Sequence, residues 1–467
     1  MEREKITGEV EISPAKLAEI KKEVKNISEF KRKIEHSLSA SATELLGIIL
    51  AGAISLDSSD IHIEPEEEQS KIRTRIDGVL HDVIILDLKV YKTLLSRIKL
   101  LSGLKLNVTD RPQDGRFTIL MAETTVAETS SHLPERSEGR EMNEVQRTPP
   151  RPASRGSVIE IRTSTLPAEY GESIVLRILN PKSLIEIEAL GLRKDLVEIF
   201  EREIKKPNGM IIVTGPTGSG KTTTLYAVLK RINSPEIKII TIEDPVEYHL
   251  EGISQTQVVP QKGYGFASGL KSIMRQDPDA ILIGEIRDLE TAEIACQAAL
   301  TGHLVFSTLH TNDAAGAIAR LVDLGARPIS IAPSINMVVA QRLPRKVCKK
   351  CVEFVSPSPA DLKKIKKGLS KVKKEILPPS FFSPQLKIPR AKGCENCNGT
   401  GYRGRIGIYE TFLIDDEMEK FILTSPSIVA MRELAIKKGM LLMHADGLIK
   451  VLEGITTIEE IERVTGE

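Results

Sequence analysis

One glycine-rich run, GPTGSGKT at residues 215–222, holds the residues of this chain that are most able to do chemistry. The run matches the pattern G-x-x-x-x-G-K-[ST] and stands between an apolar stretch, GMIIVTG, and a helix-forming one, KTTTLYAVLKRI. Glycines let backbone N–H groups turn inward around phosphate oxygens, while the lysine can reach the β- and γ-phosphates and the threonine can hold Mg²⁺. The predicted nucleotide-binding residues are Gly215, Pro216, Thr217, Gly218, Ser219, Gly220, Lys221, Thr222 and Thr223.

Carboxylates follow two apolar stretches downstream of this run. Glu285 ends ILIGE, and Glu243 lies in TIEDPVE. Ligands bind at the carboxyl ends of the strands in open α/β sheets, so we expect both carboxylates near the phosphates. Glu285 is predicted to hold Mg²⁺ or a metal-bound water, or to orient the attacking water, and Glu243 is the second candidate for these roles. The usual strand-end Asp is absent because Gly284 precedes Glu285, and the sequence leaves the division of roles open.

Two histidines flank the next apolar stretch, in GHLVFSTLHTND. His303 precedes the predicted strand and His310 ends it. A strand-end histidine is often structural. Beside the same sheet edge as the phosphates, however, either ring could sense the γ-phosphate, so both residues are catalytic candidates together with Lys221.

Four of the five cysteines form two C-x-x-C pairs. Thiolates at this spacing are typical ligands of tetrahedral Zn²⁺, and disulfides are not expected in a reducing compartment. Because all four positions are filled, the predicted site is structural rather than catalytic. Its ligands are Cys348, Cys351, Cys394 and Cys397. The fifth, Cys296, lies in a small-residue helical stretch and is predicted to be a buried, inert thiol.

The elements that position these residues change along the chain. Residues 14–40 are predicted to form one or two solvated helices, and strand-rich stretches follow, with a DG turn in RIDGVL. Segment 121–156 is rich in Glu, Ser, Thr and Pro and poor in large apolar residues, so we predict a disordered insertion. From about residue 190, short apolar strands alternate with helices, which predicts a parallel sheet covered on both faces.

Length and composition limit the classes of function. A chain of 467 residues with 41% apolar and 28% charged residues is typical of a soluble globular protein with two or three domains. A net charge of +1 gives no reason to expect a nucleic-acid coat. The sequence shows neither a signal peptide nor an apolar stretch long enough to span a bilayer, so we expect a cytoplasmic protein.

Taken together, the motifs resemble a known family, the ATPases that power type II secretion and type IV pilus assembly. The shared stretches include SDIHIEP, RTRIDG, RPQDGRF, GPTGSGKTTTLY, TIEDPVEY, DPDAILIGEIRDLETA, GHLVFSTLHTND and GYRGRIGIYE, besides the tetracysteine segment. The resemblance implies an α/β fold: a RecA-like P-loop ATPase domain preceded by a PAS-like α+β domain, with a zinc lobe and a helical tail. It implies a homo-hexamer with ATP and Mg²⁺ at subunit boundaries. It further implies that arginines of the first domain approach the nucleotide, and the candidates are Arg73, Arg75, Arg116 and Arg177.

By this resemblance the chain has five parts. They are a helical N-terminal segment (1–44), a PAS-like domain (45–180), a RecA-like domain (181–345), a zinc lobe (346–402) and a C-terminal helical region (403–467). The implied function is mechanical: ATP hydrolysis drives assembly of a pilus or pseudopilus beneath an inner-membrane platform protein, with recruitment proteins as further partners. The lysine-rich stretch 363–374 adds a possible contact with anionic phospholipids, although a solvated helix face is the alternative.

The motifs are also compatible with three other functions. Retraction motors of type IV pili share the resemblance but lack a tetracysteine lobe. A RecA-like nucleic-acid motor is disfavoured by the neutral net charge and by an aromatic content of 4%. A scaffold that binds ATP without useful turnover has the same motifs.

Overall fold

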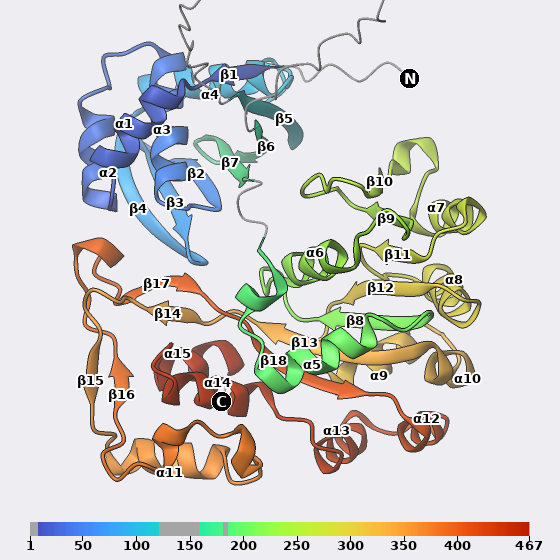
Figure 1. The fold of residues 1–467 in the computed structure, drawn as a ribbon. Coiled ribbons are helices and arrows are strands. Elements are labelled where there is room, and N and C mark those ends of the chain that lie inside the picture. Colours follow the sequence, from blue (N-terminus) through green and yellow to red (C-terminus); the bar gives the residue numbers. More distant parts are fainter. Residues whose placement is uncertain (1–7, 121–157, 181–184, 467) are drawn as a thin grey trace, which may run out of the picture. The chain divides into compact units, whose positions relative to one another are not determined.

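The structure is a computed structural model that describes residues 8–120, 158–180 and 185–466 (Figure 1). Contacts divide the chain into two compact units, Met1–Pro181 and Lys182–Glu467. The predicted disordered insertion, 121–156, lies outside the described residues.

The described part of the first unit is built on one sheet of seven strands. In spatial order they are β1 (Glu9–Glu11), β5 (Gln113–Leu120), β6 (Val158–Ala168), β7 (Gly171–Leu179), β2 (Asp60–Pro65), β3 (Gln69–Ile76) and β4 (Val79–Asp87). β1 is parallel to β5, and the other neighbours are antiparallel. Asp77 and Gly78 join β3 to β4 with φ of 50° and 83°, the left-handed pair that a tight hairpin requires, which confirms the predicted DG turn. The sequence did not predict β1.

Helices cover one face of this sheet. They are α1 (Pro14–Glu23), α2 (Ile27–Glu35), α3 (Ala42–Ser55) and α4 (Leu88–Leu101). α3 is buried along most of its length, and the Phe30 ring of α2 lies against Gly52, where a Cβ would come within 2.2 Å of it. The helices predicted as solvated therefore have a buried side: Leu17, Ile20 and Ile34 belong to the same core as the sheet.

A second seven-stranded sheet organises the other unit among its described residues. Its order is β10 (Ser254–Gln257), β9 (Ile239–Glu243), β11 (Ala280–Ile283), β12 (Leu304–Leu309), β8 (Gly209–Thr214), β13 (Ile335–Arg342) and β18 (Ile408–Leu413). The strands are parallel except β18, which runs antiparallel to β13. Every residue of β8, β9, β11 and β12 is buried, so the prediction of a parallel sheet covered on both faces is confirmed.

Helices lie on both faces of this second sheet (Figure 1). On one face are α5 (Lys194–Glu203) and α6 (Lys221–Ile232), packed on Ile211 and Val213 of β8. The core of the other face contains Met210 and Ile212, and its first helices are α7 (Phe266–Ile273), α8 (Leu289–Leu300), α9 (Ala315–Asp323) and α10 (Pro328–Ile331). Successive strand residues thus point to opposite layers, as the strand pleat requires.

The last quarter of the chain adds two small antiparallel sheets of two strands each and a group of helices. The strands are β14 (Arg345–Val347) with β17 (Tyr402–Arg405), and β15 (Glu353–Val355) with β16 (Ile388–Arg390). The helices are α11 (Pro359–Gly368), α12 (Asp416–Ile422), α13 (Ile428–Lys437), α14 (Met443–Leu452) and α15 (Ile458–Thr465). Glu460 of α15 accepts hydrogen bonds from Arg345 of β14, at 2.8 Å and 3.0 Å, which ties the first small sheet to the helices.

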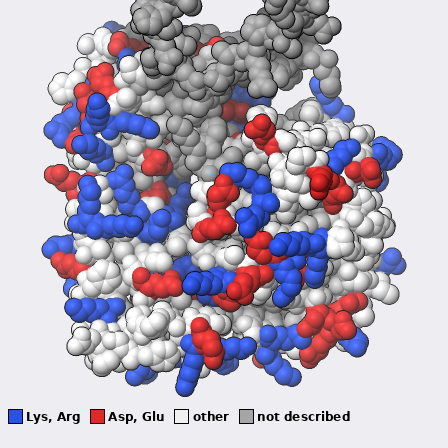
Figure 2. All heavy atoms as spheres, in the orientation of Figure 1, with Lys and Arg blue, Asp and Glu red and all other residues white. Residues whose placement is uncertain are grey.

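The surface is mixed in charge. On the face drawn in Figure 2, basic and acidic side chains are interspersed over the described atoms, in keeping with the net charge of +1. Among the helices that the structure describes, none combines the length and apolar character needed to cross a membrane.

Candidate active site

The glycine-rich loop 215–222 joins the carboxyl end of β8 to the start of α6. Gly215 and Gly220 have φ of 149° and 88°, which favour glycine. A Cβ at Gly215 would lie 2.5 Å from the carbonyl oxygen of Gln341, and one at Gly220 would lie 2.8 Å from its side-chain Nε2. The loop is therefore pressed against β13, and larger residues at either position would displace it.

Two polar groups of this loop have the character of a phosphate site. Lys221 is 9% exposed, and its Nζ donates hydrogen bonds to the carbonyl oxygens of Gly215 (2.8 Å) and Pro216 (3.3 Å). Burial lowers the pKa of Lys221, although Glu285 opposes the shift. Ser219 Oγ is buried with no hydrogen-bond partner among the described residues. Within the described ranges no carboxylate forms an ion pair with Lys221, and this buried cation and the unpartnered Ser219 hydroxyl both fit a bound triphosphate.

Glu285 lies at the same edge of the sheet, two residues beyond β11. Its side chain is 15% exposed and forms an ion pair with Arg287, whose guanidinium also lies 3.5 Å from Asp244. His310, at the end of β12, has its Nε2 3.5 Å from Glu285 Oε2. Burial and the nearby Lys221 lower the pKa of His310, against the opposing pull of Glu285. The structure thus brings the glycine-rich loop, Glu285 and His310 together.

Glu243 is placed differently. It is 3% exposed and accepts hydrogen bonds from the Tyr226 hydroxyl, from Thr241 Oγ1 at 2.5 Å and from Gln255 Nε2 at 3.2 Å. Burial raises its pKa, against these three hydrogen bonds. None of these partners belongs to loop 215–222. Glu243 links β9, β10 and α6, whereas Glu285 lies beside His310 at the carboxyl ends of the strands.

His303 does not reach this edge. It precedes β12, and its carbonyl oxygen accepts a hydrogen bond from Gly209 N–H, at 3.2 Å, where β8 begins. Its ring Nδ1 is 3.1 Å from the carbonyl oxygen of Ala298, at the end of α8. The structure therefore places His303 at the amino ends of these strands and His310 at their carboxyl ends.

Sequence reasoning missed Gln341 of β13. This residue is 1% exposed, and its side-chain Oε1 accepts a hydrogen bond from Thr224 Oγ1 of α6 at 2.7 Å. It also forms the surface against which Gly215 and Gly220 pack. A single glutamine inside the apolar stretch NMVVAQR was the available signal, because a polar side chain in a buried strand needs a partner.

The four candidate arginines lie in the first unit, on β3, β5 and β7. Asp60 of β2 lies between two of them, 3.5 Å from Arg75 and 2.9 Å from Arg177. Arg73 pairs with Glu64 at 2.6 Å. Arg116 belongs to the same row across the sheet, through its neighbour Arg162, which is paired in register with Arg177. That these arginines approach a nucleotide stays a prediction.

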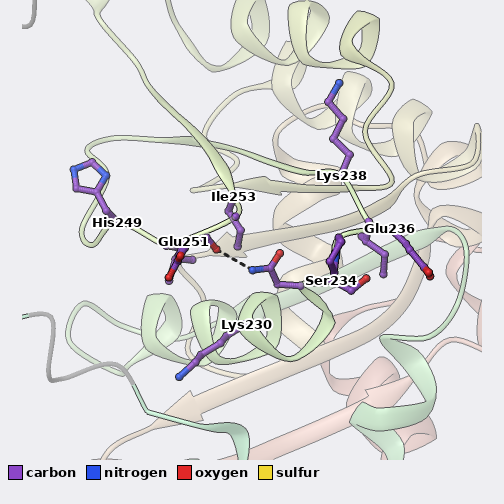
Figure 3. Close-up of a pocket in the computed structure, with 12 residues that line it drawn as sticks. Lys230, Ser234, Glu236, Lys238, His249, Glu251 and Ile253 are labelled. Atoms are coloured by element: carbon purple, nitrogen blue, oxygen red, sulfur yellow. Dashed lines mark hydrogen bonds between the residues drawn. The ribbon is translucent and has the colours of Figure 1, made fainter. Parts of the chain in front are cut away.

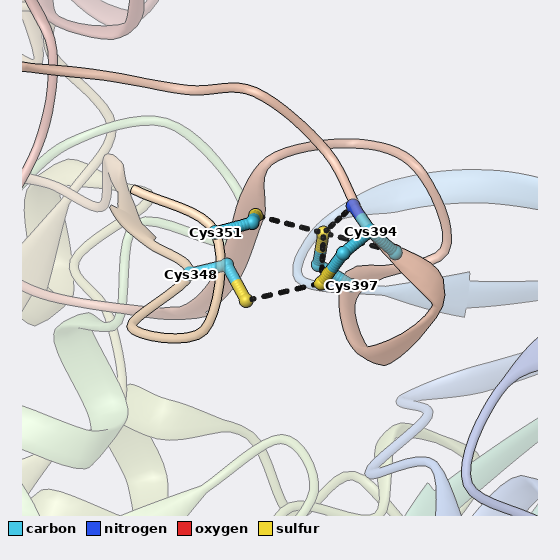
Figure 4. Close-up of side chains that lie close together, drawn as sticks. All are labelled: Cys348, Cys351, Cys394 and Cys397. Carbon is cyan, nitrogen blue, oxygen red and sulfur yellow. Dashed lines mark hydrogen bonds between the residues drawn. The ribbon is translucent and has the colours of Figure 1, made fainter. Parts of the chain in front are cut away.

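The predicted zinc ligands converge although 42 residues separate the two pairs in sequence. Their four Sγ atoms all lie within 4.8 Å of one another (Figure 4). The separations of Cys348 from Cys394, Cys351 from Cys397 and Cys394 from Cys397 are 3.9, 3.8 and 3.7 Å. Zn–S bonds of about 2.3 Å in a tetrahedron place sulfurs about 3.8 Å apart, so the cluster fits one Zn²⁺. Backbone N–H groups of Cys394 and Gly401 donate to Cys397 Sγ, at 3.1 and 3.2 Å, as they would to a thiolate.

A cavity of about 720 Å³ lies elsewhere in the second unit (Figure 3). It is lined by the end of α6, by residues 234–238 before β9 and by residues 249–253 before β10. These are the amino ends of the strands, opposite the glycine-rich loop. The cavity contains no predicted site residue.

Fold and site together define a class: an α/β protein with a glycine-rich strand-to-helix loop, a carboxylate and a histidine at the carboxyl ends of its parallel strands. The model of the type II/IV secretion system protein family matches residues 35–145 and 153–463. The chain belongs to this family, and the family predicted from the sequence motifs is confirmed.

Individual relatives are consistent with membership of this family. The chain is 41% identical to the type II secretion system ATPase E of Vibrio cholerae over 435 residues, 93% of this chain and 77% of the relative. It is 41% identical to the type IV pilus assembly ATPase PilB of Thermus thermophilus over 424 residues, 90% of this chain but 43% of that longer protein. The solved structure of the Legionella pneumophila ATPase DotB has a similar fold, with a TM-score of 0.59 and 21% identity over 90% of this chain and 95% of DotB.

Proposed function

We propose that this protein is a cytoplasmic ATPase that converts ATP hydrolysis into mechanical work for assembly of a pilus or pseudopilus. The observation that carries the proposal is the convergence of loop 215–222, Glu285 and His310 at one sheet edge, in a chain of this family. The relatives named as a type II secretion ATPase and a type IV pilus assembly ATPase support the same activity. In this proposal the second unit is a RecA-like domain and the first is PAS-like.

Each residue at the edge has a distinct role. The backbone of loop 215–222 binds the phosphates, and Lys221 exchanges its carbonyl partners for phosphate oxygens. Ser219 Oγ gains the partner that it lacks, and Thr222 and Glu285 are the Mg²⁺ candidates. When bound, Mg²⁺ would neutralise charge on the β- and γ-phosphates. In this proposal Glu285 also orients the attacking water, and His310, whose pKa is lowered, senses the γ-phosphate.

The wider assembly belongs to the proposal as well. We infer a homo-hexamer in which Arg73, Arg75, Arg116 and Arg177 approach a nucleotide. Its partners would be an inner-membrane platform protein and recruitment proteins, at the cytoplasmic face of that membrane. Zn²⁺ held by the four cysteines would staple β14 and β17 to the segment around Cys394. Nucleic acid is not expected as a partner.

Steady-state hydrolysis of Mg-ATP by the purified full chain tests the proposal, with the Lys221→Ala variant as the blank. We expect turnover by the wild type that single-stranded DNA or RNA does not stimulate, and none by the variant. Binding of ATP without turnover would instead indicate a nucleotide-gated scaffold. Stimulation by nucleic acid would indicate a nucleic-acid motor.

A further inference from the structure

The histidine loop, residues 310–314 after β12, is held on one side by the nucleotide site. The Thr311 N–H donates to Thr214 Oγ1 at 2.9 Å, and the two threonine hydroxyls lie 2.7 Å apart. Thr214 is the last residue of β8, directly before the glycine-rich loop. His310 faces Glu285 at 3.5 Å. A shift of either the glycine-rich loop or Glu285 therefore acts directly on the histidine loop.

The other side of the histidine loop contacts the C-terminal elements. Ala314 N–H donates to Glu410 Oε1 of β18 at 3.0 Å. Asp313 uses both carboxylate oxygens: Oδ1 accepts from Gly316 N–H at 2.7 Å, and Oδ2 accepts from the Arg432 guanidinium of α13 at 2.5 Å. Inside the loop, Thr311 Oγ1 donates to the carbonyl oxygen of Asp313 at 2.9 Å. A continuous chain of polar contacts thus runs from Thr214 to α13.

We propose that Asp313 and Arg432 are positioning residues for hydrolysis, and that their ion pair couples the histidine loop to α13. The proposal rests on the proposed ATPase function. In this proposal, a movement of His310 that depends on the bound nucleotide is passed through Arg432 to the C-terminal helices. The proposed roles require no contact of either residue with the nucleotide. Both residues act by fixing where the histidine loop lies relative to Glu285.

The ion pair is poorly suited to a purely structural role. The side chains of Arg432 and Asp313 are 38% and 24% exposed, and ion pairs with this exposure contribute little to stability. α13 has separate anchors in the buried Met431 and Ala435 and in the Ser427 cap that accepts from Ala430 N–H. Loss of Arg432 should therefore leave the helix folded while releasing the histidine loop.

Steady-state kinetics of the full chain test the coupling with Asp313→Asn, Arg432→Gln and the double variant. Asn keeps an acceptor for Gly316 N–H but loses the charge. We expect kcat to fall about three- to tenfold in each single variant, because misplacing a catalytic group lowers the rate, while KM for Mg-ATP stays within about twofold. The double variant should be no slower than the slower single variant, and Arg432→Lys should recover part of the loss. Lys438→Gln is the matched control, because Lys438 pairs with Asp415 and Glu417 near α12 and not with the histidine loop.

Amide hydrogen exchange of residues 428–437 distinguishes coupling from a merely structural role, because a structural role would not make the exchange rate depend on the nucleotide. Wild-type protein should change its exchange there when a non-hydrolysable ATP analogue and Mg²⁺ bind, and Arg432→Gln should bind the analogue without that change. Unaltered kcat in both single variants, an equal loss in Lys438→Gln, or an exchange response that persists in Arg432→Gln would overturn the coupling. A wild type that does not hydrolyse Mg-ATP would instead refute the proposed function itself.

Discussion

At the scale of residues, the site depends on two largely buried charged side chains, Lys221 and Glu285. Lys221 is buried against backbone carbonyls, and Glu285 is held between Arg287 and His310. Burial disfavours the charged form of the lysine, so binding of a phosphate anion relieves a cost that the folded protein already bears. Glu243 was the second candidate in the sequence, but its buried carboxylate already accepts three hydrogen bonds inside the core. The two glutamates are distinguished by the residues that surround them in the fold, and not by their neighbours in the sequence.

The lowered pKa of His310 predicts the pH dependence of hydrolysis. A histidine with a lowered pKa is neutral at pH 7 and gains its proton only in more acidic solution. Protonation would add a second cation beside Lys221 and would bind Glu285 more tightly, so we expect kcat to fall as pH drops through that pKa. Measured from pH 5.5 to 8 at saturating Mg-ATP, His310→Gln should lack this acid limb. An identical acid limb in both proteins would contradict the role of His310.

At the scale of elements, the carboxyl edge of the parallel sheet gathers loop 215–222, Glu285 and His310. Sequence predicted this edge well, because each of the three follows an apolar strand within a few residues. Prediction from the sequence failed where contacts between distant parts of the chain determine the position of a side chain. His303 and His310 flank one strand but reach opposite edges, and Gln341 braces the glycine-rich loop from more than a hundred residues away. β1, with the charged sequence EVE, forms only because the edge of β5 offers it backbone partners.

The tetracysteine cluster predicts one structural Zn²⁺ per chain. Closed four-thiolate sites contribute their binding energy to folding, so removal of the metal should lower the thermal unfolding midpoint. Elemental analysis of protein purified without chelator should give about one equivalent of zinc, because four thiolates fill a tetrahedral site. Cys351→Ser should lose the metal, and Cys296→Ala should keep it because Cys296 lies outside the cluster. Zinc well below one equivalent in the wild type would count against the site.

At the scale of the whole molecule, the described surface carries interspersed charges, and the lysine-rich stretch is a local exception. Ile365, Leu369 and Val372 are buried, and Lys364 pairs with Glu462 at 2.5 Å. The remaining lysines of the stretch are exposed: Lys363, Lys366, Lys367, Lys371, Lys373 and Lys374. A protein that works beneath a membrane platform would present such a face to anionic head groups.

We expect this face to bind acidic vesicles in a salt-sensitive way. Each lysine near an anionic surface contributes about 1 kcal/mol, so replacing Lys366, Lys367 and Lys371 by Gln should weaken binding roughly a hundredfold. The matched control replaces the exposed Lys21, Lys22 and Lys25 by Gln and should bind like the wild type. Sedimentation with acidic and with neutral vesicles measures the difference. Equal pelleting of the two variants on acidic vesicles would contradict lipid binding and would indicate that the stretch is only a solvated helix face.

The central claim is that ATP is hydrolysed at the sheet edge where Glu285 faces Lys221 and His310. One assay tests it most directly: single-turnover hydrolysis of Mg-ATP by wild type, Glu285→Gln and Glu243→Gln, with bound nucleotide measured in the same samples. Glu285→Gln keeps the shape of the side chain but removes its charge, so we predict that it retains ATP and loses most hydrolysis. Glu243→Gln should hydrolyse faster than Glu285→Gln at equal ATP occupancy. Full hydrolysis by Glu285→Gln, with the activity lost in Glu243→Gln instead, would contradict the account.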